Sequence, residues 1–102
     1  MTVINLEILT QERTTVLGSK VKGADAREKF NLDELDKNAE SIDVIIPDYI
    51  VTFTPSFFLG LFSKSLDTLG EDGFFRKNHF KSTREIIQKQ ILSGVEDWKC
   101  AR

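Results

Sequence analysis

The stretch of residues 44–69 constrains the fold most, because it reads as a buried strand that leads through a turn into a helix. It opens on an apolar, β-branched run, which is typical of a short strand buried on both faces, and we expect this strand to span Ile42–Ile46. Pro47–Tyr49 reads as a turn, and Ile50–Phe53 as extended chain. A central strand followed by a turn is therefore the core of the expected fold.

The helix that follows has a start signal, an apolar face and a stop signal. Thr54 is predicted to cap it, and Pro55 suits the first helical position because that position needs no N–H group. Residues of the buried face recur at helical spacing: Phe58, Leu61, Phe62, Ser65, Leu66 and Leu69. Gly70 is predicted to end the helix. A buried strand that leads into such a helix indicates an α/β domain, in which the intervening turn often carries function.

The remaining segments predict three further strands and two further helices around this unit. The strands are expected at Thr2–Thr10, at Thr14–Gly18 antiparallel to the first, and at Phe74–Phe80 after a turn at Glu71–Gly73. The helices are expected at Ala24–Leu35, with a break near Asn31, and at residues 83–95, where Ser82 and Glu85 form a capping box. The fold class is α/β, an α+β sandwich with helices packed on a mixed sheet in which Ile42–Ile46 is central.

Length, composition and charge limit the number of domains and the classes of function that we expect. The 102 residues predict a single domain, 1–102, and the 40% apolar and 29% charged fractions are those of an ordinary globular protein. A net charge of −2 gives no reason to expect nucleic-acid binding. With no apolar run of membrane-spanning length, no signal peptide and one cysteine, Cys100, we expect no membrane association and a cytoplasmic location.

Catalytic and cofactor chemistry finds little support in the sequence. Gly18 and Gly23 have the spacing of a phosphate loop, but the Lys–Ser/Thr pair is missing and Ala24 follows. His79 is the only histidine, so no zinc set is apparent. We therefore expect no metal, no cofactor and no catalysis. One alternative is a small nucleotide-binding module, whose candidate residues are Lys20, Lys22, Arg27 and His79.

The segments Gly23–Glu28, Ile42–Ile46, Thr54–Phe57 and Leu69–Gly70 carry a resemblance to a known family. Over residues 18–95 the chain resembles the short bacterial STAS-like domains of unknown function and, more remotely, the STAS domains of anti-sigma factor antagonists. In that family a glycine and an arginine open the first helix, and a buried strand leads to a Ser/Thr-Ser-Phe helix start. Where the family usually has an acidic residue and a glycine turn, this chain has Ile46–Tyr49.

The resemblance implies a non-catalytic, regulatory domain that binds a protein, with a histidine-kinase-type ATP-binding protein as the suggested partner. It also implies phosphorylation at Thr54 or Ser56, where a phosphate would meet a helix N-terminus. Phe57 lies off the apolar stripe, so we expect it either to be an exposed anchor for a partner or to pack on the neighbouring helix. The docking surface is predicted at the turn and at the start of the central helix: Asp48, Tyr49, Thr54, Ser56, Phe57 and Gly60. A phage or mobile-element inhibitor with the same fold is an alternative.

Overall fold

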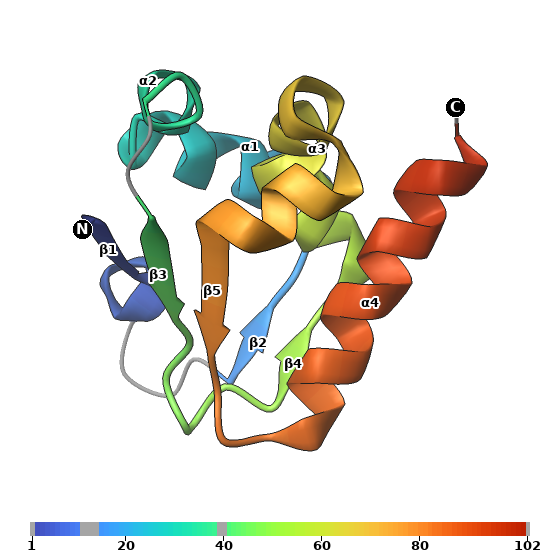
Figure 1. Ribbon diagram of the computed structural model, residues 1–102. Coiled ribbons are helices and arrows are strands. Elements are labelled where there is room, and N and C mark those ends of the chain that lie inside the picture. The colour runs from blue at the N-terminus through green and yellow to red at the C-terminus, as the bar shows by residue number, and fades with distance from the viewer. Residues whose placement is uncertain (1, 11–14, 39–40, 102) are drawn as a thin grey trace.

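A three-stranded sheet in which every strand runs in the same direction forms one side of the fold (Figure 1). The computed structural model describes residues 2–10, 15–38 and 41–101. β3 (Ile42–Ile45) lies between β1 (Thr2–Asn5) and β5 (Asn78–Lys81), and both pairings are parallel. The central position predicted for this strand is confirmed, as is the α/β class. The prediction of a mixed sheet is wrong, because every pairing among the described strands is parallel.

Only one face of the three-stranded sheet is fully buried. Ile42 and Val44 of β3 are completely buried, whereas Asp43 and Ile45 between them are half-buried. Val3 on β1, which pairs in register with Asp43, is exposed. The expectation of a strand buried on both faces is therefore wrong, because the helices pack against one face only and the alternating side chains of the other face reach the surface.

A second sheet consists of two short strands, β2 (Val16–Leu17) and β4 (Thr52–Phe53), which pair in parallel. The predicted antiparallel pairing of this region with the first strand is wrong. β1 ends at Asn5, whose side chain accepts a hydrogen bond from the backbone N–H of Glu7 at 3.0 Å and caps a 3₁₀ turn, η1 (Leu6–Leu9). The chain thus leaves the first sheet before Thr10, and β2 pairs with β4 instead.

The first predicted helix is found as two helices, α1 (Lys20–Lys29) and α2 (Leu32–Leu35). The break near Asn31 is confirmed, since Asn31 has a φ of 55° between them. The predicted start at Ala24 is wrong, because α1 begins at Lys20 and includes Gly23. The hydroxyl of Ser19 accepts from the backbone N–H of Lys22 at 3.1 Å and caps the helix four residues earlier than expected.

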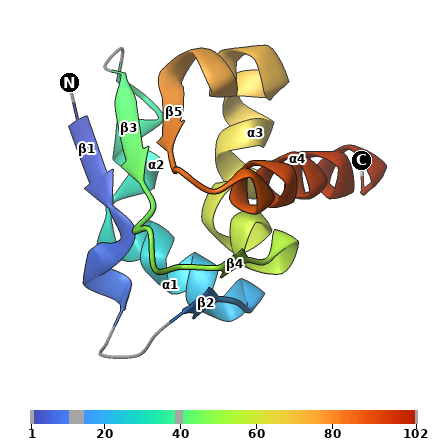
Figure 2. The same cartoon turned by 90° about the horizontal axis from the view of Figure 1, so that it is seen from below.

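The long helix α3 (Pro55–Lys77) passes through the centre of the molecule, and in Figure 2 it lies between the three-stranded sheet and α4 (Glu85–Cys100). Gly70, with φ 73° and ψ 168°, is not helical, so the predicted end of the helix at this residue is confirmed. A second helical segment follows the kink and continues to Lys77. The turn and strand predicted from residue 71 onward are therefore wrong up to Lys77. Phe74 is helical because there it joins the core aromatic rings, with Phe62 at 5.1 Å and Phe80 of β5 at 5.9 Å between centroids.

α4 also differs from its prediction at both ends. The predicted capping box is absent, because the hydroxyl of Ser82 accepts from the N–H of Arg84. Arg84 is the N-cap residue, and its side chain makes no capping hydrogen bond. The helix continues past Val95 to Cys100, since buried Trp98 donates its indole N–H to Asp67 at 2.8 Å. None of the helices in the described ranges is long and apolar enough to cross a membrane.

Candidate partner-binding site

The start of α3 has the local structure that the sequence predicts. Thr54 is extended, with φ −66° and ψ 148°, and its hydroxyl accepts a hydrogen bond from the backbone N–H of Phe57 at 3.1 Å. Pro55 occupies the first turn of the helix. The predicted cap is confirmed. Thr54 is half-buried with its hydroxyl engaged, whereas Ser56 in the first helical turn is exposed.

The turn between β3 and β4 is closed by a hydrogen bond from the N–H of Ile50 to the carbonyl of Pro47 at 3.1 Å. Asp48 is exposed and is tied to the segment before α4. Its carboxylate accepts from the hydroxyl of Thr83 at 2.8 Å, and its carbonyl accepts from Nε of Arg84 at 2.6 Å. These two contacts fix the turn against a distant part of the chain, so that it presents a defined surface.

Tyr49 joins the same turn to the end of η1. Its hydroxyl lies 2.7 Å from Oγ1 of Thr10, and its ring is 44% exposed. Val51, two residues on, donates its N–H to the carbonyl of Thr15 at 2.8 Å, directly before β2. The turn, η1 and the start of β2 therefore adjoin one another, although they are far apart in sequence.

Two of the predicted surface residues pack against other parts of the fold. Phe57 is only 2% exposed, and its ring packs edge-on against Phe53 at 5.2 Å. Of the two alternatives for Phe57, the exposed anchor is wrong and packing on the neighbouring helix is found, because α1 covers the side of α3 on which Phe57 lies. Gly60, which is half-buried, packs closely against α1, and its role as a partner contact stays a prediction. A Cβ atom there would overlap the carbonyl oxygen of Lys20 and lie 2.9 Å from the nitrogen of Ala24.

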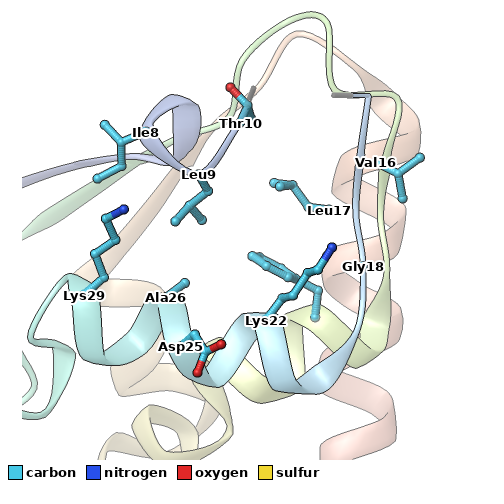
Figure 3. A pocket seen from close by; sticks show the side chains of 11 residues that line it. Ile8, Leu9, Thr10, Val16, Leu17, Gly18, Lys22, Asp25, Ala26 and Lys29 are labelled. Carbon is cyan, nitrogen blue, oxygen red and sulfur yellow. The ribbon is translucent and has the colours of Figure 1, made fainter. Parts of the chain in front are cut away.

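Beside the turn lies a groove of about 480 Å³, which we call the η1–β2 groove (Figure 3). Its two walls are η1 and β2, and α1 runs along its base. Buried Leu17, Ala26 and Phe57 contribute apolar surface to it. Lys22 and Lys29 extend from α1. The sequence indicates Lys22 only as a candidate of the nucleotide-binding alternative and does not predict the groove. The one local signal for the groove is the pair of lysines seven residues apart on α1.

Arg27, a candidate of the nucleotide-binding alternative, is not free to hold a phosphate. It is 6% exposed, and its guanidinium donates to the carboxylate of Asp36 at 2.6 Å, the hydroxyl of Ser65 at 2.8 Å and the carbonyl of Leu61 at 3.0 Å. The hydrogen bond from Arg27, together with its charge, holds the pKa of Asp33 below its ordinary value of 3.8. Arg27 therefore joins α1 to α3 and to the segment after α2, and these contacts already engage its guanidinium.

His79 lies on β5, outside both the turn and the groove, and its Nε2 is 2.9 Å from the carbonyl oxygen of Arg76. Cys100 is exposed at the end of α4. In the described part of the chain, no group of three or more His, Cys, Asp or Glu side chains is arranged to hold a metal ion. Of the predicted site residues, Asp48 and Tyr49 thus lie together in the turn, and Thr54 and Ser56 lie at the start of α3, with β4 between the two groups.

Comparison of the chain with protein-family models, with curated proteins and with solved structures finds no match.

Proposed function

We propose that this chain is a non-catalytic regulatory domain that binds a protein partner through the turn after β3 and the start of α3. The observation that carries the proposal is the apolar surface at this turn. Tyr49 is 44% exposed, Val51 40% and Val16 50%, and hydrogen bonds hold their segments next to one another. Exposed aromatic and aliphatic side chains on a rigid surface are common anchors at protein interfaces.

The rigidity of the turn supports the same proposal. Because Asp48 and Tyr49 are each held by contacts to distant segments, the surface loses little conformational freedom when a partner binds. The suggested partner, a histidine-kinase-type ATP-binding protein, follows from the STAS-like resemblance.

A phosphorylation switch at this surface belongs to the proposal, and Ser56 is its better candidate. Ser56 is exposed, whereas the hydroxyl of Thr54 already accepts a hydrogen bond in the cap. A phosphate on Ser56 would lie in the first turn of α3, where the helix dipole favours negative charge. The fold would therefore tolerate the modification, and the added charge would act on the partner.

Photo-crosslinking followed by titration tests the proposal. A photoreactive phenylalanine analogue replaces Tyr49 in the host cell, and the same analogue at exposed Leu92 on α4 serves as the control. A partner captured only at Tyr49 is then purified and titrated. We expect Tyr49→Ala and Ser56→Asp to weaken binding about tenfold or more, while Leu92→Ala and Ser93→Asp leave it unchanged. Equal affinity for all four variants would show that the interface lies elsewhere.

A further inference from the structure

The edge of β2 that faces away from β4 carries backbone groups that can pair with another strand. The carbonyls of Thr15 and Leu17 accept hydrogen bonds from Val51 and Thr54, at 2.8 and 3.0 Å, and so point toward β4. Because successive peptide groups of a strand point to opposite sides, those of Val16 point the other way. No described strand pairs with that edge, and the η1–β2 groove runs along it.

The groove has the composition of a site for an extended chain. Leu17, Ala26 and Phe57 line it as buried apolar surface, and exposed Ile8 and Val16 lie on its opposite walls (Figure 3). In an extended segment alternate side chains point to the same side, so every second residue could meet the apolar surface. Addition of a strand to an exposed sheet edge, with pockets for alternate side chains, is a recurrent mode of peptide recognition.

The charge of the groove selects the chemistry of its occupant. Lys22 and Lys29 are seven residues apart on α1 and therefore lie on the same side of the helix. Both are exposed, and neither pairs with an acidic side chain of the described residues. In Figure 3 both ammonium groups extend toward the space between η1 and β2, and Asp25, three residues after Lys22 on α1, also lines the groove. Two cations and one carboxylate therefore line the groove, which leaves it with a net positive charge in a chain whose net charge is −2.

We propose that the η1–β2 groove binds an extended acidic segment of the protein partner, which adds to β2 as a parallel or antiparallel strand and places carboxylates at Lys22 and Lys29. This inference rests on the proposed function, because the segment belongs to the partner that docks at the turn. The two surfaces are continuous, since Thr10 lines the groove and bonds to Tyr49, and Phe57 lines it beside the Thr54 cap.

Selection from a random peptide library displayed on phage, with the full chain immobilised, tests the inference. We expect the selected peptides to alternate acidic and apolar residues. A synthesised peptide from that selection should bind about tenfold more weakly to Lys22→Glu/Lys29→Glu than to the wild-type chain, because two favourable charge pairs become repulsive. Lys81→Glu/Lys89→Glu, which makes the same change of charge outside the groove, should bind normally.

Two backbone readouts separate strand addition from simple charge attraction. Amide resonances of Val16 and Gly18 should shift on titration with the peptide. N-methylation of alternate peptide amides should abolish binding in one register only, since a strand donates to its neighbour with every second N–H group. Selected peptides without acidic residues, binding that both charge-reversed proteins retain, or resonance shifts confined to other elements would each overturn the inference.

The outcome is distinguishable from failure of the proposed function. If the acidic peptides bind the groove but partner affinity is insensitive to Tyr49→Ala and Ser56→Asp, the turn surface is wrong and the groove remains. If those two variants weaken partner binding while Lys22→Glu/Lys29→Glu does not, the groove inference is wrong and the turn remains. Self-association of the chain that Lys22→Glu/Lys29→Glu abolishes would assign the groove to a second copy and overturn the inference as well.

Discussion

At the scale of single residues, Ser19 holds an unfavourable backbone conformation at the start of α1. Among the described residues, only Ser19 and Asn31 have positive φ without being glycine. Asn31, at φ 55° and ψ 46°, lies in the left-handed region that asparagine tolerates. Ser19, at φ 77° and ψ 138°, lies outside it, where strain costs about 1–3 kcal/mol. The hydrogen bond that its hydroxyl accepts in capping α1 offsets part of this cost.

Two substitutions at this position should separate the cap from the strain. Ser19→Ala removes the hydroxyl and keeps the strain, so we expect the free energy of unfolding to fall by about 1 kcal/mol. Ser19→Gly also removes the hydroxyl but relieves the strain, so stability should be unchanged or slightly higher. Urea denaturation measures both variants. Equal destabilisation by Ala and Gly would contradict the positive φ of Ser19.

A second prediction at this scale concerns Asp33 and acid pH. Arg27 lowers the pKa of Asp33 in the folded state, first by its hydrogen bond and then by its charge. A lowered pKa gives stability that is present above the unfolded pKa, near 3.8, and that is lost as the pH falls through the lower folded value. We expect wild-type stability to fall more steeply than that of Asp33→Asn below about pH 4, in urea melts at several pH values. Parallel pH profiles would rule out this contribution.

At the scale of elements, the crossing of α1 over α3 depends on two glycines. A Cβ atom at Gly23 would overlap the carbonyl oxygen of Phe57 and lie 2.9 Å from the nitrogen of Leu61, and one at Gly60 would overlap the backbone of Lys20. The neighbours are backbone atoms, which cannot rotate away as a side chain can. The two helices are therefore in direct backbone contact, and this contact fixes how α1 lies over the core.

We expect Gly23→Ala and Gly60→Ala each to lower the free energy of unfolding by about 3 kcal/mol, because the helices must move apart to admit the methyl group. Gly73→Ala is the matched control in α3. Its Cβ would meet only the side chain of Leu69, at 3.4 Å. There the greater helix propensity of alanine should raise stability by about 0.5–1 kcal/mol. Thermal and urea melts test the contrast, and a neutral Gly60→Ala would show that the helices are not so close.

The elements that sequence can predict are those whose signals lie next to one another. The Thr54 cap and the break at Asn31 depend on neighbouring residues, and both are found. The role of Gly23, which is to let the backbones of α1 and α3 come into contact, cannot be predicted from its neighbours in the sequence, because it depends on the approach of α3. Phe74, similarly, lies in a helix, where its ring packs against the rings of Phe62 and Phe80, which are distant in the sequence.

Part of the candidate site can likewise be predicted from local sequence, and part of it depends on distant contacts. The turn after β3 and the exposed Ser56 follow from local sequence, whereas the burial of Phe57 depends on α1 lying over α3. The η1–β2 groove depends on β2 pairing with β4 and not with β1. The short sequence Val16–Leu17 does not indicate whether it pairs with β1 or with β4, so the groove could not be predicted.

At the scale of the whole molecule, one buried polar network fastens α1 to α3 and to the segment after α2. Arg27 of α1 contacts Asp36, Ser65 and the carbonyl of Leu61, and the hydroxyl of Ser65 donates to Asp36 at 2.7 Å. Arg27 and Asp36 are almost fully buried and Ser65 is completely so. A buried charge depends strongly on its partner, so these side chains act as one unit.

We expect Asp36→Ala to lower the free energy of unfolding by about 3–5 kcal/mol, because it leaves the guanidinium of Arg27 buried without its shortest contact. Replacement of both partners, as Arg27→Met/Asp36→Leu, should cost less than the sum of the single changes, since no unpaired charge remains. A double-mutant cycle by urea denaturation measures this coupling. Strictly additive losses would mean that the two side chains stabilise the fold independently.

The parallel pairing of the described strands has a consequence for the speed of folding. β1 pairs with β3, β3 with β5 and β2 with β4, and helices or long loops intervene in every case. No described pair is a hairpin that could form from neighbouring residues. Such non-local pairings are slow to form, because the loop between the strands must close first. We therefore expect the sheets to form late in folding. Until they form, the apolar edges of β1 and β2 are exposed and can pair with other chains. Refolding of this protein should therefore be most efficient at low protein concentration.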